Sequence, residues 1–153
     1  MKNAHRNASH ARRKYQADPS SIYKLMNKLQ PFTPEELLQL ELPIRISFES
    51  IKTGSGTERD FHDIAAAINT AIVCSESVDP LCESVAIAAR DALVRTWHRF
   101  ERTGRIGFDG PAIGEVESGI ELHEQLIRLS TPIQMLDAGR EVIRRGHAKQ
   151  TVS

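Results

Sequence analysis

The cysteine and histidine side chains are the first candidates for chemistry, because these residue types bind metal ions and act as nucleophiles or bases. Cys74 and Cys82 are eight residues apart, and the chain has no CxxC or HxxxH pair. Zinc sites generally use tighter ligand spacing than this. Both thiols fall on or beside apolar stripes, where a cysteine behaves as a small hydrophobic residue. We therefore expect two structural thiols, no metal site and a reducing compartment.

Three histidines are candidates for a catalytic or metal-binding centre. His62, His98 and His123 belong to three different predicted helices, so an enzyme would need them to converge in space. His123 borders an apolar helix face, which favours a partly buried histidine with satisfied hydrogen bonds over a ligand or a base. An enzyme built on these histidines is our third hypothesis, and it predicts bound metal or a measurable loss of activity when they are replaced.

The sequence shows no other catalytic or cofactor-binding motif. Gly54-Ser55-Gly56 lacks the lysine and the preceding strand of a P-loop, and no βαβ unit surrounds the glycine-rich stretch from Gly104 to Gly110. A GxSxG elbow is absent. The acidic residues between Glu117 and Arg128 fit the i, i+4 spacing of a solvated helix face. We therefore predict no catalytic residues, no cofactor and no enzymatic activity.

The most distinctive predicted surface is a basic face on the helix expected over residues 80–103. Such a face can dock into an acidic surface of a partner protein or lie along phosphates. The alternative is a solvated face paired with the chain's own acids. Phe108, in the following loop, would anchor either the domain's own core, which we favour, or the partner. The candidate partner-binding residues are Arg95, His98, Arg99, Arg102, Arg105 and Phe108.

The charges are segregated along the chain although the formal net charge is zero. Residues 1–30 carry seven basic and one acidic residue, residues 31–89 three basic and ten acidic, and residues 90–105 five basic and two acidic. This pattern favours a protein partner or self-association over a broad nucleic-acid footprint. The nucleic-acid alternative combines the 90–105 helix face with a basic tail, and it predicts binding that falls steeply with salt. The tail residues concerned are Arg6, Arg12, Arg13 and Lys14.

Capping residues and prolines in the sequence predict where the helices that carry these residues begin. Thr33-Pro34, Asp79-Pro80 and Thr131-Pro132 each combine a capping residue with a proline at the first helical position. Thr57 caps a further helix, another is expected from about residue 112 to 130, and no run has the period of a strand. We predict an all-α bundle of about five helices. Residues 1–17 form a flexible basic tail, residues 18–146 a single helical domain and residues 147–153 a C-terminal tail.

The helix expected between Thr33 and Thr53 carries apolar residues on two edges. Pro43 predicts a kink or a split in it. The alternation in sign of Glu41, Arg45 and Glu49 predicts an exposed face. A helix with apolar residues on two edges must be buried on most sides, and either the domain core or a homodimer would bury it. The main stripe is Leu37, Leu40, Ile44, Phe48 and Ile51, with Leu38, Leu42 and Ile46 beside it.

Length and composition are those of one soluble globular domain, at 153 residues, 40% hydrophobic and 26% charged. The longest stretch without a charge, Ile64 to Ser75, has 12 residues, which is too short to cross a bilayer. The first 15 residues have no apolar segment typical of a secretory signal peptide. We expect a cytoplasmic protein without a membrane partner.

Two segments carry a resemblance to known proteins: the stretch that begins PFTPEELLQLELPIRISFES at Pro31 and runs to about Ser75, and the segment TWHRFERTGRIGFDGPAI. They resemble short uncharacterised proteins of proteobacterial phages and mobile elements, which likewise have a basic N-terminal tail. The resemblance implies a cytoplasmic accessory protein in a bacterial host. Small accessory proteins of phages commonly bind a host or phage protein, including components of antiviral defence. Our leading hypothesis is therefore a non-enzymatic protein-binding module, and a nucleic-acid-associated regulatory protein is the alternative.

Overall fold

The computed structural model describes residues 28–151, and contacts within the chain separate a unit that begins at Pro31. This unit contains five helices and, among the described residues, no strand, which confirms the all-α prediction. The predicted tail over residues 1–17 and the first ten residues of the predicted helical domain, 18–27, lie outside the described residues. No helix in the described part is long and apolar enough to span a membrane. The helices are α3 (Pro34–Lys52), α4 (Glu58–Ser75), α5 (Pro80–Thr103), α6 (Gly110–Arg128) and α7 (Pro132–Thr151).

The predicted helix caps are confirmed. Thr33 and Thr57 each form a reciprocal capping box with the residue three positions on, because the cap hydroxyl accepts from a backbone N–H and the carboxylate accepts from the cap's own N–H. The Asp79 carboxylate accepts from the N–H of Leu81 at the start of α5. Gly104 ends α5 at φ 72°, a left-handed conformation that favours glycine. These local signals fix where each helix begins and ends.

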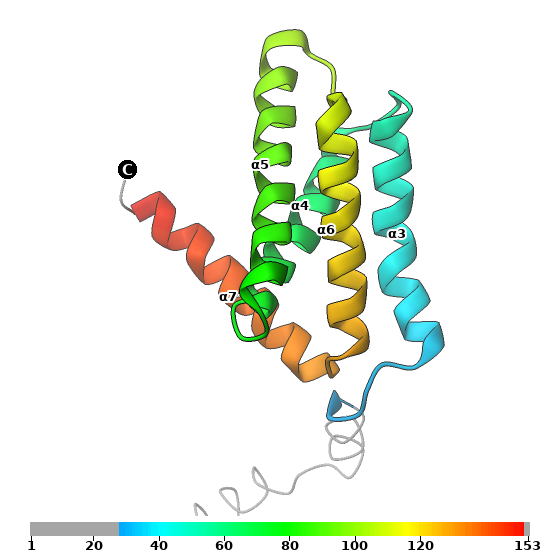
Figure 1. Ribbon diagram of the computed structural model, residues 1–153, viewed down its shortest axis with the longest axis vertical. Helices are drawn as coiled ribbons and strands as arrows, with labels where there is room; N and C mark the ends of the chain where they lie inside the picture. The colour runs from blue at the N-terminus through cyan, green and yellow to red at the C-terminus, as the bar shows by residue number, and fades with distance from the viewer. Residues whose placement is uncertain (1–27, 152–153) are drawn as a thin grey trace, which may run out of the picture. The chain divides into compact units, whose positions relative to one another are not determined.

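Four helices, α3 to α6, form the bundle, with α3 and α5 on opposite sides (Figure 1). Each of these two packs against both α4 and α6, while α7 packs mainly against α4. The close approach of α6 depends on Gly119, where an added Cβ would lie 2.5 Å from the Ala89 Cβ and 2.7 Å from the Ile68 Cδ1. The core is formed mainly by Phe48, Ile51, Ile64, Ile68, Leu93, Val116 and Ile120.

Two predictions about α3 hold only in part. Of the kink or split predicted at Pro43, the split is wrong, because the helix runs unbroken through this residue. Of the three charges predicted to form an exposed face, Glu49 is exposed. Arg45 and Glu41 lie instead at the boundary with α6, where Arg45 donates to both carboxylate oxygens of Glu124 at 2.7 and 2.8 Å, and Glu41 accepts from Arg128. As a consequence the second apolar stripe of α3 faces solvent.

The C-terminal helix also differs from its prediction. Thr131 caps it by accepting from the N–H of Gln134, as the sequence indicates. The helix then continues to Thr151, beyond residue 146, where the sequence predicts the end of the helical domain. Its side-chain ion pairs, described below, connect this last part to the end of α4.

Candidate functional site

The basic face predicted on α5 divides into paired and unpaired cations. Arg95 contacts Glu115 at 2.6 Å and Asp109 at 3.4 Å, so the chain's own acids hold it, as the alternative interpretation of this face expects. Its pKa is raised by the hydrogen bond to Glu115. Arg99 and Arg102, in contrast, are exposed and form no ion pair with the described residues. A partner therefore finds these two cations without first displacing an acid of the chain.

The distribution of ion pairs identifies one end of the bundle. Arg59 opens α4 and Arg105 follows α5, and neither forms an ion pair within the described part. A cleft lined by Thr57, Gly104 and Arg105 shows that these two helix ends lie together. Apart from these two and from Arg99 and Arg102, every described arginine has an acidic group within 4 Å; these are Arg45, Arg90, Arg95, Arg128, Arg140, Arg144 and Arg145.

This end is mixed in charge, because Glu58 and Asp63 lie on the first turns of α4 and Glu101 on the last turns of α5. The Glu101 carboxylate accepts from the indole N–H of Trp97 at 3.1 Å. Proteins that bind nucleic acid through phosphates usually present a more continuous basic surface. The interleaved acids therefore suit a protein partner better than a phosphate backbone.

Beside this face, a groove runs between α4 and α5. Its upper part is a cleft of about 370 Å³ with Ala65 and Asn69 on one wall and Val94 and Trp97 on the other. The lining is mainly aliphatic and aromatic. Trp97 is only half-buried, although it stacks between Phe61 and Phe100 with ring centroids 5.1 Å apart in each pair. Tryptophan is enriched in protein interfaces and among the residues that contribute most to binding, so an accessible Trp97 favours a protein-binding groove.

The groove continues toward α7. A second cleft, of about 470 Å³, shares Asn69 and Arg90 with the first and is closed on its far side by Val142 and Arg145 of α7. The lower part of the α4 surface is thus already covered by an amphipathic helix of the same chain. The upper part, beside Trp97, has no such cover among the described residues.

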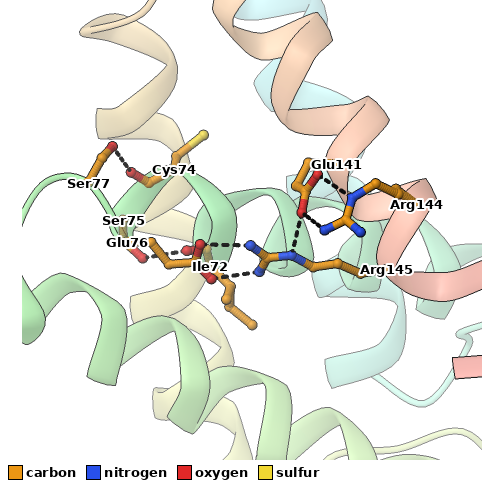
Figure 2. Close-up of polar contacts among 8 residues, drawn as sticks. All are labelled: Ile72, Cys74, Ser75, Glu76, Ser77, Glu141, Arg144 and Arg145. Atoms are coloured by element: carbon orange, nitrogen blue, oxygen red, sulfur yellow. Dashed lines mark hydrogen bonds and ion pairs between the residues drawn. The ribbon is translucent and has the colours of Figure 1, made fainter. Parts of the chain in front are cut away.

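Ion pairs hold α7 in this position, as Figure 2 shows. Arg145 donates to both carboxylate oxygens of Glu76, at 2.6 and 2.8 Å, and to Glu141 at 2.9 Å. Arg144 donates to the same Glu141 carboxylate at 2.6 and 2.8 Å. Hydrogen bonds from Arg144 and then Arg145 lower the pKa of Glu141 to about 2, and Arg145 lowers the pKa of Glu76. Arg145 is therefore the link between α7 and the end of α4.

The three histidines do not form a centre. His62 and His98 are exposed, whereas His123 is 6% exposed within the bundle. No group of three or more histidine, cysteine or acidic side chains in residues 28–148 is placed to hold a metal ion. His123 is more deeply buried than the partly buried histidine expected, and the prediction that its hydrogen bonds are satisfied is wrong, since no group of the described residues pairs with Nδ1. Burial lowers the pKa of His123 to about 4.

The remaining candidates are packing residues. Phe108 is partly buried with its ring centroid 5.5 Å from that of Phe48, so it joins the core, as we favoured. Cys74 and Cys82 are free thiols that pack against a small cluster around Leu122, and burial raises the pKa of Cys74. Among the partner-binding candidates, His98, Arg99, Arg102 and Arg105 thus stay accessible. The tail residues Arg6, Arg12, Arg13 and Lys14 lie outside the described residues.

Comparison of the chain with protein family models, with curated proteins and with solved structures gave no match. The site must therefore be interpreted from its own geometry. The sequence analysis did not find the groove, because the apolar residues at helical spacing on residues 80–103 are those expected to face the core, among them Leu93 and Trp97. The available signal was Val94, an aliphatic residue that directly follows Leu93 and falls outside this spacing.

Proposed function

We propose that this chain is a non-enzymatic helical protein-binding module that holds a helical segment of its partner in the groove between α4 and α5. The observation that carries the proposal is an open apolar groove beside Val94 and Trp97, next to cations that no acid of the described chain occupies. The partner segment would present an apolar stripe to the groove and acidic side chains to His98 and Arg102.

The lower part of the same surface supports a helical occupant. There α7 already packs against α4, with Val142 beside Ile72 and Val73 and with charged side chains along the edges. A partner helix in the upper part would extend this arrangement along the groove. Such an apolar centre with a polar rim is the usual composition of a protein interface.

The resemblance to proteins of phages and mobile elements supports the cytoplasm of a bacterial host as the place of action. In that setting the module would act by occupying a surface of a host or phage protein, and a component of antiviral defence is one such target. The alternative, a nucleic-acid-associated protein, rests on Arg99, Arg102 and Arg105, together with the basic tail. The interleaved acids at this end of the bundle make it the second candidate.

The test is affinity capture from bacterial lysate, with and without nuclease, followed by identification of the retained proteins. Three forms of the full chain are compared: the wild type, Val94→Glu in the groove, and Gln125→Glu, which adds the same charge at an exposed site on α6. We expect a discrete protein that survives nuclease, is lost with Val94→Glu and is kept with Gln125→Glu. Partners that disappear on nuclease treatment would contradict the proposal and favour the nucleic-acid alternative.

A further inference from the structure

The outer face of α3 exposes a row of large aliphatic side chains. Leu38, Leu42 and Ile46 are 59, 49 and 56% exposed, and their spacing of four residues places them along one side of the helix. A shallow cleft runs beside Leu42 and Ile46. The inner face of the same helix already fills the core through Phe48 and Ile51. This exposed row is therefore additional to what the fold needs.

Both ends of the row are acidic. Glu35 precedes it and Glu49 follows it; within the described part of the chain Glu35 forms no ion pair, whereas Glu49 has the Lys52 ammonium at 3.8 Å. If two copies met through this face in antiparallel fashion about Leu42, Glu35 of one would lie against Glu49 of the other. A parallel arrangement would place each glutamate against its own equivalent. Like charges at both ends thus disfavour pairing of this face with itself.

The same chain also has a surface with basic residues at both ends, opposite in charge to the ends of the α3 row. Along α5, Arg90, Val94, His98 and Arg102 follow one another at intervals of four residues, with Val94 46% exposed and Trp97 beside it. Arg90 contacts its neighbour Asp91 at 3.1 Å, whereas Arg102 forms no ion pair with the described residues. At 1.5 Å per residue, Arg90 to Arg102 spans about 18 Å and Glu35 to Glu49 about 21 Å. An antiparallel approach would place a cation near each glutamate and Val94 near Leu42.

We propose that the partner in the α4–α5 groove is a second copy of this chain, which inserts the Leu38/Leu42/Ile46 face of its α3. The proposal rests on the proposed function in that it names the occupant of the same groove. The two surfaces are different faces of the chain, on helices α3 and α5 that lie on opposite sides of the bundle (Figure 1). Copies therefore associate head to tail, which produces either rings or open chains and not a reciprocal dimer.

Sedimentation of two complementary variants of the full chain tests the head-to-tail contact. Leu42→Glu disables the α3 face and Val94→Glu disables the groove; both positions are exposed, so the fold is expected to persist, and circular dichroism checks it. The mass of the wild type should rise with concentration beyond that of a dimer. Each variant alone should be monomeric. An equimolar mixture should give a one-to-one dimer and nothing larger, because each variant keeps one intact surface.

Several results would overturn this inference. If the wild type is monomeric at all concentrations, a second copy is not the occupant of the groove. If a dimer is abolished by Leu42→Glu but kept by Val94→Glu, the α3 face pairs with itself. A mixture that stays monomeric shows that the two surfaces are not each other's partners. Gln125→Glu is the matched control and should associate like the wild type. If self-association fails while lysate capture still depends on Val94, the proposed function stands and only the second copy is wrong.

Discussion

Replacement of His123 by leucine tests the strongest electrostatic feature of the core. The imidazole is buried, its Nδ1 has no hydrogen-bond partner among the described residues, and burial lowers its pKa from 6.5 to about 4. The unfolded chain therefore binds this proton more tightly than the folded one, and stability decreases as pH falls from 6.5 toward 4. At about 1.4 kcal/mol per pKa unit, the full loss is about 3 kcal/mol, of which about 2 kcal/mol falls between pH 7 and pH 5.

The measurement is urea unfolding of the wild type and of His123→Leu at pH 7, 6 and 5. The wild type should lose about 2 kcal/mol between pH 7 and 5, and the variant should lose much less. At pH 7 the variant should be more stable, because it removes an unsatisfied buried polar atom whose cost is about 1–3 kcal/mol. The carboxylates of Asp60, Glu76 and Glu141 have lowered pKa values, so the stability they contribute is lost only below about pH 4.5.

Two results would refute this reasoning. One is an equal loss of stability between pH 7 and 5 in the wild type and in His123→Leu. The other is a proton titration of His123, followed by nuclear magnetic resonance, with a midpoint near 6.5. Either result would mean that water reaches the imidazole or that an acceptor binds Nδ1 in solution.

Three further predictions concern packing and ion pairs. Gly119→Val should destabilise the fold by about 1–3 kcal/mol or more in urea unfolding, because an added side chain has no space against α4 and α5. Arg45→Met should cost about 1–3 kcal/mol, since it leaves the Glu124 carboxylate unpaired with its side chain only 13% exposed; Arg140→Met, at an exposed pair, should change stability little. Arg145→Ala should increase amide hydrogen exchange in α7 by a factor of about five while the core stays protected, as expected for exposed ion pairs worth up to about 1 kcal/mol. Unchanged exchange in α7 would show that apolar contacts alone hold this helix.

The helix boundaries could be predicted from the sequence because they depend on local chemistry. Thr33 and Thr57 form their capping boxes with residues three positions away, and Gly104 needs only its own left-handed conformation. No contact with another helix is required for these signals. The same argument explains why α7 was predicted too short: nothing local to Gly146 indicates that the helix continues, and the ion pair of Arg145 with Glu76 joins residues 69 apart.

The assignment of helix faces depends on neighbours and was less predictable. The sequence shows Glu41 and Arg45 four residues apart, which is equally consistent with an exposed pair and with two separate contacts to another helix. The structure has the second arrangement, because α6 presents Arg128 and Glu124 at matching heights. Similarly, Gly119 looks like a weak point of a helix until Ala89 and Ile68 are placed against it. Such choices depend on which helices meet, information that no local pattern carries.

The contrast between the two kinds of arginine bears on how the surface came to be organised. Ion pairs between exposed groups stabilise little, so stability alone gives weak reason to match seven arginines with acids. Yet, among the described residues, Arg99, Arg102 and Arg105 form no ion pair, and neither do Glu35 and Glu36 at the start of α3. The same two helices carry exposed apolar side chains, Val94 on α5 and Leu38 on α3. The fold leaves charged and apolar side chains unused both on α3 and on α5, and an intermolecular contact explains this better than folding does. The complementary variants Leu42→Glu and Val94→Glu measure whether these two surfaces meet.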